Sequence, residues 1–148
     1  DAIAVTGLSF GGFTTLSAAQ WGPRLDAVLA LAPGGTAVLQ PEAITIPAMV
    51  IGSEKDESVG FAESAKAYQR LAGPRFLVEL LGGTHLNFTD SCMPLCGADA
   101  PSQAKAHRLV LHYALPFMRH YVARKHVPAV ALTRKVRGVT VMAEAHRS

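Results

Sequence analysis

Ser9 lies at the centre of the pattern Gly7-Leu8-Ser9-Phe10-Gly11, and a serine hydroxyl in such a turn can act as a nucleophile. The apolar run Ala2–Thr6 precedes the pattern and helical spacing follows it, which predicts a sharp strand-to-helix turn. There the helix dipole and the Phe10 N–H can stabilise an oxyanion. A glycine-rich strand–helix turn without chemistry is the alternative interpretation.

A serine nucleophile needs a base, and the base needs a carboxylate that orients it. On a sheet of successive strands these groups follow in the order serine, acid, histidine. Asp56 comes after the apolar run Ile46–Gly52, and His85 comes after Arg75–Leu81. Because the carboxyl ends of parallel strands meet at one edge of a sheet, we expect Ser9, Asp56 and His85 to act there as catalytic residues.

Two neighbours compete with Asp56 for the role of the acid. Glu54 and Glu57 lie in the same loop, and a loop with three acids can also be simply solvated. The position in the loop favours Asp56. His85 could instead cap the segment that follows it. The other histidines are expected to be surface or packing residues: His107, His112, His120, His126 and His146.

Four apolar runs without alternation predict strands that are buried on both faces of a sheet. These runs are Ala2–Thr6, Asp26–Ala32, Ile46–Gly52 and Arg75–Leu81. Apolar spacing predicts helices over Ser9–Gln20, about 57–72 and about 102–124, the last kinked at Pro116. Strands that alternate with helices predict an α/β fold, with a parallel sheet and helices on both of its faces.

The order of the elements predicts the C-terminal part of a larger domain. Strands whose ends carry functional residues usually follow several earlier strand–helix units, whereas here the first residues already form a strand of the buried type. We expect residues 1–126 to form this part and residues 127–148 to be a basic tail. Residues 105–148 carry nine Lys and Arg side chains against Glu144 alone. Since the tail has no interleaved aromatic residues, a solvated helix face and tail are expected rather than a nucleic-acid surface.

Composition excludes several classes of protein. The 148 residues are 49% hydrophobic and 17% charged, which excludes an intrinsically disordered chain. No apolar run approaches the roughly 18 residues that a membrane span needs, so no membrane span is expected. Gly7–Gly12 lacks the spacing of a dinucleotide-binding turn, and no phosphate-binding loop motif is present. We therefore expect no cofactor and no metal.

Three segments make the chain resemble the α/β-hydrolase superfamily: Gly7–Gly12, Met49–Asp56 and Thr84–Asp90. The Ser-Phe-Gly-Gly turn and the His-x-Asn-Phe-x-Asp run are the specific parts, and the resemblance covers about residues 1–125. It is closest to bacterial predicted dienelactone hydrolases and the platelet-activating-factor acetylhydrolase-like group. The resemblance implies a serine esterase whose triad consists of the serine, aspartate and histidine named above.

The chain departs from this family at several points. Dienelactone hydrolases use a cysteine where this chain has Ser9, which favours the esterase branch. Leu8 stands where the family usually has histidine, a neighbour that shapes the pocket. The family's earlier strands, and the loop with the second oxyanion donor, are absent from this sequence. We therefore expect the isolated chain to be a weak enzyme and to associate with itself edge to edge through Ala2–Thr6.

Cys92 and Cys96 lie in the loop that follows His85. Two sulfurs without a second pair of ligands do not predict a zinc site. A local disulfide, which would suit an exported enzyme, and two reduced cysteines both fit this spacing. The location of the protein therefore stays open between the bacterial cytoplasm and export.

These observations predict a serine hydrolase that cleaves a small-molecule carboxylic ester through an acyl-enzyme. One alternative is an incomplete, catalytically incompetent α/β-hydrolase fragment or binding module. The other is a serine peptidase or polyester hydrolase with the same triad.

Overall fold

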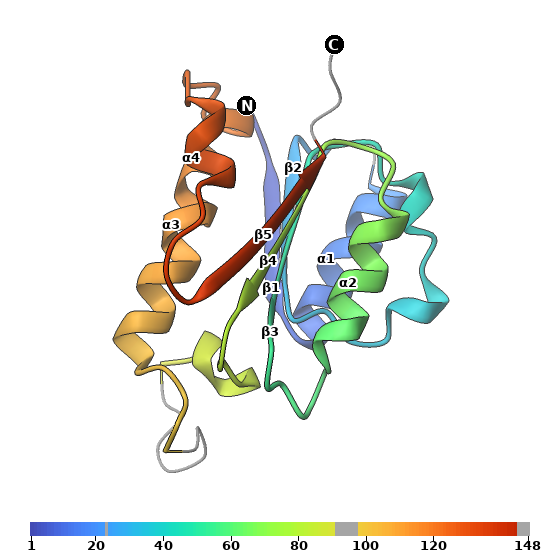
Figure 1. Cartoon of the computed structure of the whole chain (residues 1–148). Coiled ribbons are helices and arrows are strands. Elements are labelled where there is room, and N and C mark those ends of the chain that lie inside the picture. The colour runs from blue at the N-terminus through green and yellow to red at the C-terminus, as the bar shows by residue number, and fades with distance from the viewer. Residues whose placement is uncertain (23, 91–97, 145–148) are drawn as a thin grey trace.

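The chain forms a five-stranded, mostly parallel sheet across residues 1–22, 24–90 and 98–144, which the computed structural model describes (Figure 1). β1 to β4 are parallel, whereas β5 pairs antiparallel with β4. The strands lie side by side in the order β1 (Ala4–Leu8), β2 (Ala27–Leu31), β3 (Ala48–Ser53), β4 (Arg75–Leu80) and β5 (Val139–Glu144).

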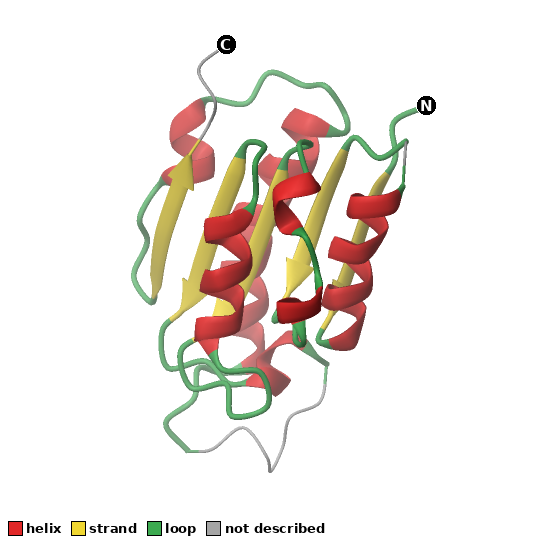
Figure 2. Ribbon diagram, turned by 90° about the vertical axis from the view of Figure 1, so that its right-hand side faces the viewer, coloured by secondary structure: helices red, strands yellow, loops and turns green. Residues whose placement is uncertain are grey.

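Helices cover both faces of this sheet, as Figures 1 and 2 show. One face carries α1 (Phe10–Trp21), α2 (Phe61–Arg70) and the short 3-10 turns η1 (Thr36–Val38) and η2 (Pro41–Ala43). The other face carries α3 (Gln103–Tyr121) and α4 (Ala129–Thr133), and a third 3-10 turn, η3 (His85–Phe88), follows β4. The predicted α/β fold, with helices on both faces of a parallel sheet, is confirmed.

Successive residues of the central strands point to opposite faces, so the sheet has one core on each side. Val28 and Val50 pack with Leu16 of α1 on one side. Phe76 packs edge to face against Phe117 of α3 on the other, with ring centroids 5.7 Å apart. Burial on both faces explains why β2 and residues Ala48–Ile51 of β3 are continuously apolar rather than alternating.

Most elements differ by one to four residues from their predicted bounds, and two of these differences bear on the site. The first strand continues through Gly7 to Leu8 instead of ending at Thr6. The helix expected from about residue 57 begins at Phe61 instead. The reason is local: Asp56 Oδ1 accepts hydrogen bonds from the backbone N–H groups two and three residues later, which forms a turn in place of the first helical residues.

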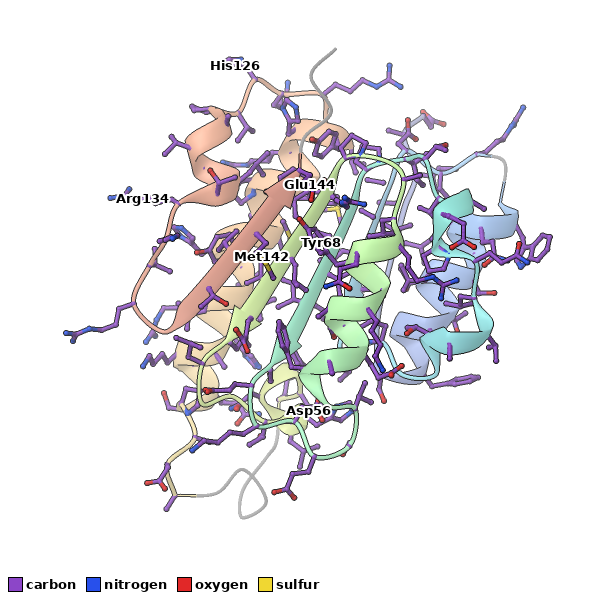
Figure 3. The ribbon with its side chains drawn as sticks, turned by 45° about the vertical axis from the view of Figure 1, so that its right-hand side comes forward. Asp56, Tyr68, His126, Arg134, Met142 and Glu144 are labelled. Carbon is purple, nitrogen blue, oxygen red and sulfur yellow. The ribbon has the colours of Figure 1, made fainter. Side chains whose placement is uncertain are left out.

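The expectation of a basic tail over residues 127–148 is wrong for the segments that form α4 and β5. β5 is part of the sheet, with Val139 buried and Thr140 donating to Glu79 of β4 at 2.7 Å. Glu144, at the end of β5, forms an ion pair with Arg75 (Figure 3). The sequence does carry part of the signal, because apolar residues alternate with polar ones at Val139, Thr140 and Val141 and again at Ala143 and Glu144. The many Lys and Arg side chains of residues 105–148 nevertheless favour a solvated tail over a strand in the sequence-based prediction.

β1 lies at one edge of the sheet. In the part of the chain that the structure describes, β1 pairs with β2 alone. Ile3, just before it, is 47% exposed. Within the same described residues, no helix combines the length and the apolar character that crossing a membrane requires.

Candidate active site

Ser9 occupies the turn between β1 and α1 in a backbone conformation that L-residues rarely adopt. Its φ is 59° and its ψ is −116°. The surrounding hydrogen bonds hold it there: the Ser9 N–H donates to Leu31 O of β2 at 2.9 Å, and the Ser9 carbonyl accepts from the Phe13 N–H at 3.0 Å. A strained residue fixed from both sides is typical of a functional turn.

Two glycines make this turn possible. A Cβ atom on Gly7 would lie 2.4 Å from the carbonyl oxygen of Gly11, and one on Gly12 would lie 2.7 Å from Leu31 O. Only glycine therefore lets β1, α1 and the end of β2 approach so closely. Gly11, the second glycine of the sequence pattern, has open space where a Cβ would be.

The Phe10 N–H lies at the N-terminus of α1, directly after Ser9. Among the described residues it has no hydrogen-bond partner, which is normal for the first N–H groups of a helix. This donor and the positive end of the helix dipole can stabilise negative charge beside Ser9.

Asp56 is fixed by hydrogen bonds to both of its carboxylate oxygens. Oδ2 lies 2.7 Å from Nδ1 of His85, and Oδ1 accepts from the N–H groups of Ser58 and Val59 at 2.9 and 2.8 Å. Only 1% of the Asp56 side chain is exposed, and Figure 3 places it beyond the end of β3. Since a carboxylate only accepts hydrogen bonds, Nδ1 of His85 is the donor, and Nε2 remains as the ring nitrogen that can accept a proton.

The two competing acids take other positions. Glu54 accepts a hydrogen bond from the Gly82 N–H at 2.7 Å, so its carboxylate closes the turn after β4. Glu57 is exposed and lines a surface hollow together with His85. Neither contacts the imidazole through a hydrogen bond in the described residues, whereas Asp56 does.

The His85 loop is held by groups whose role the sequence analysis missed. Thr84 and Asn87 form a capping box around η3: the Asn87 side chain accepts from the Thr84 N–H at 2.9 Å. Asn87 is fully buried and also donates to Pro101 O at 3.0 Å. The Thr-x-x-Asn spacing of a capping box is the signal that could have found it. The Lys55 N–H donates to Gly83 O at 2.8 Å, which joins this loop to the Asp56 loop.

Ser9 and His85 lie at the same end of the sheet, where the parallel strands have their carboxyl ends. Ser9 follows β1 and His85 follows β4. β2 and β3 separate the two strands. The structure thus brings Asp56 and His85 into contact, while no hydrogen bond joins Ser9 to His85 within the described residues. The imidazole is still accessible, with 16% of its side chain exposed.

The expected pair Cys92 and Cys96 lies outside the described residues. Within residues 1–22, 24–90 and 98–144, no group of three or more His, Cys, Asp and Glu side chains is arranged to hold a metal ion. The chain matches no protein-family model and no curated protein.

Proposed function

We propose that this chain is a serine hydrolase that cleaves carboxylic esters, with Ser9 as nucleophile, His85 as base and Asp56 as the residue that orients the base. The observation that carries the proposal is the buried Asp56–His85 contact of 2.7 Å at the sheet edge where the strained Ser9 turn lies. An acid, a base and a serine hydroxyl at one edge are the groups that acyl transfer requires.

In the first step, the Ser9 hydroxyl oxygen attacks the ester carbonyl carbon while Nε2 of His85 takes the hydroxyl proton. The carbonyl oxygen becomes an oxyanion, which the Phe10 N–H and the α1 dipole stabilise. The bond between the carbonyl carbon and the alcohol oxygen then breaks, and His85 returns its proton to the leaving alcohol. Asp56 accepts the hydrogen bond from Nδ1 throughout, which stabilises the imidazolium.

In the second step, water attacks the acyl group that is bound to Ser9, again with His85 as base. The bond between the acyl carbon and the serine oxygen breaks, the proton returns to Ser9, and a carboxylic acid leaves. For this cycle the His85 ring must reach the Ser9 hydroxyl, and hydrogen bonds of this kind are often long or absent before substrate binds.

Labelling with a fluorophosphonate probe tests the proposal, because such probes react with activated serines. The full chain should be labelled at Ser9, and Ser9→Ala should abolish both labelling and turnover of p-nitrophenyl acetate. Ser17→Ala, which removes the serine inside α1, is the matched control and should retain both. Labelling that persists in Ser9→Ala would contradict the assignment.

Two further results separate the competing functions. An unlabelled chain with a native circular dichroism spectrum would favour the catalytically incompetent fragment or binding module. Labelling of Ser9 together with cleavage of a peptide or a polyester, but not of small esters, would favour the peptidase or polyester hydrolase.

A further inference from the structure

Two surface depressions of opposite character lie beside the candidate catalytic residues. The first, which we call the Phe10 groove, has a volume of about 440 Å³ and is lined by Ser9, Phe10, Phe13, Gly34, Gly35 and Val38. The second, the His85 hollow, has a volume of about 320 Å³ and its lining includes His85, Lys55, Glu57, Ser58 and Asp99. The first thus contains the proposed nucleophile and the second contains the proposed base.

The Phe10 groove is apolar. Among the described residues that line it, Ser9 alone has a polar side chain, and the rings of Phe10 and Phe13 stack with centroids 5.6 Å apart. Phe10 is 77% exposed and Val38 is 80% exposed, so both keep a large apolar surface in water. Covering that surface with an apolar group is favourable, because it removes apolar area from water.

The loop that carries Val38 is held in place by its neighbours. Thr36 is buried and its hydroxyl donates to Glu63 of α2 at 3.1 Å. Leu39 is also buried, and its carbonyl oxygen accepts from Arg70 of α2 at 3.1 Å. Val38 is therefore presented to solvent by an anchored segment, and this wall of the groove exists before a ligand binds.

The chemistry of ester cleavage decides which part of the substrate each depression must hold. The acyl group is attached to Ser9 in the covalent intermediate, so it must extend along the wall that contains Ser9. The alcohol leaves with the proton that His85 returns to it, so it departs past His85. The apolar groove is thus on the acyl side and the polar hollow is on the alcohol side.

We infer that the substrate is an ester of an apolar carboxylic acid with a polar, hydrogen-bonding alcohol. The acyl chain lies in the Phe10 groove against Phe10, Phe13 and Val38, and the alcohol lies in the His85 hollow among Lys55, Glu57 and Asp99. This inference rests on the proposed function, because it takes Ser9 as the acylated residue.

Alkanesulfonyl fluorides test the acyl side directly, since they sulfonylate a catalytic serine and carry a single organic group. Hexanesulfonyl fluoride should label Ser9 at least about tenfold faster than methanesulfonyl fluoride, as the added methylenes enter an apolar groove. Val38→Asp should lower that rate ratio by about tenfold and Val38→Leu should preserve it. Val130→Asp, at a 62% exposed valine of α4, is the matched control and should leave the ratio unchanged.

The results separate a wrong assignment of the acyl side from a wrong proposed function. Equal rates for both reagents, or a ratio that Val38→Asp leaves intact, would overturn the acyl assignment while the serine hydrolase stands. An absence of labelling at Ser9 by either reagent and by the fluorophosphonate would overturn the proposed function, and the inference with it.

A pair of substrates tests the alcohol side. Glycerol monohexanoate and butyl hexanoate share one acyl group, and the glycerol ester should be hydrolysed with the higher kcat/KM, measured as acid released in a pH-stat. Lys55→Ala and Glu57→Ala together should reduce this preference several-fold without changing the sulfonyl fluoride ratio. A preference for the butyl ester would overturn the assignment of the His85 hollow to a polar alcohol.

Discussion

The Glu54 carboxylate accepts a hydrogen bond from the Gly82 N–H at 2.7 Å, so it connects the same two loops as the Asp56–His85 contact does. The two acids nevertheless do different things. Glu54 closes a turn with an exposed side chain, whereas Asp56 is buried and bonded to the imidazole. The two carboxylates are therefore not interchangeable.

Asp56→Asn should lower kcat/KM by up to about 10⁴, because an amide no longer holds the required imidazole tautomer. Glu54→Gln should stay near wild type, since a glutamine oxygen can still accept from the Gly82 N–H. Glu57→Gln should lose at most several-fold, because Glu57 lines the His85 hollow but forms no hydrogen bond with the imidazole in the described residues. Turnover of p-nitrophenyl acetate measures all three variants. A large loss in either glutamine variant would mean that another acid orients His85.

Gly7→Ala should lower the free energy of unfolding by about 2 kcal/mol, because its Cβ would lie 2.4 Å from a backbone oxygen that cannot move alone. Gly11→Ala is the matched control, with open space at its Cβ. It should raise the free energy of unfolding by roughly 0.5–1 kcal/mol, as expected for alanine in a helix. Urea denaturation measures both, and equal effects of the two substitutions would refute the close approach.

Ser9→Gly should raise the free energy of unfolding by about 1 kcal/mol while removing activity. A residue at φ 59° stores strain on the order of 1–3 kcal/mol, and glycine relieves it. Ser9→Ala keeps a Cβ and should change stability by less than about 0.5 kcal/mol. If thermal and urea unfolding show that Ser9→Ala is more stable than Ser9→Gly, the turn is not strained in solution.

All three tyrosines of the chain have a pKa above the ordinary value of 10.0, because burial disfavours the charged phenolate. A raised pKa stabilises the fold fully below the unfolded value, and this contribution is lost as pH rises through the folded value. The midpoint of tyrosinate absorbance should therefore lie above pH 10.0, and circular dichroism should be lost over the same range. Titration at the ordinary value in a native chain would contradict this burial.

The open edge of β1 should promote association of the chain with a second copy. Ser9 donates its N–H to β2, so alternation directs the Thr6 N–H to the open side. Thr6→Pro removes this donor and should shift sedimentation toward the monomer, while Thr6→Ser should behave like wild type. A wild-type chain that is monomeric at high concentration would show that β1 does not act as a template.

The fold was predictable where a strand is covered by helices on both faces of the sheet. β2 and residues Ala48–Ile51 of β3 are apolar because both faces of the sheet are covered, and glycines mark the ends of several predicted strands. β5 was not predicted, since its identity depends on pairing with β4, which no local count of charges reveals. Likewise, the order of the elements predicts Asp56 and His85 at one edge, but their contact and the buried capping by Asn87 depend on loop geometry.

The antiparallel pairing of β5 with β4 has a consequence for how the protein is made. Arg75 and Glu144, which pair across these strands, are separated by 69 positions in the chain. During synthesis, β1 to β4 are made before β5. The backbone N–H and C=O groups along the outer side of β4 stay unpaired while η3, α3 and α4 are produced. Contacts between such distant segments form slowly, and an exposed strand edge invites misassembly. The nascent chain therefore exposes the edge of β4 to misassembly until β5 pairs with it.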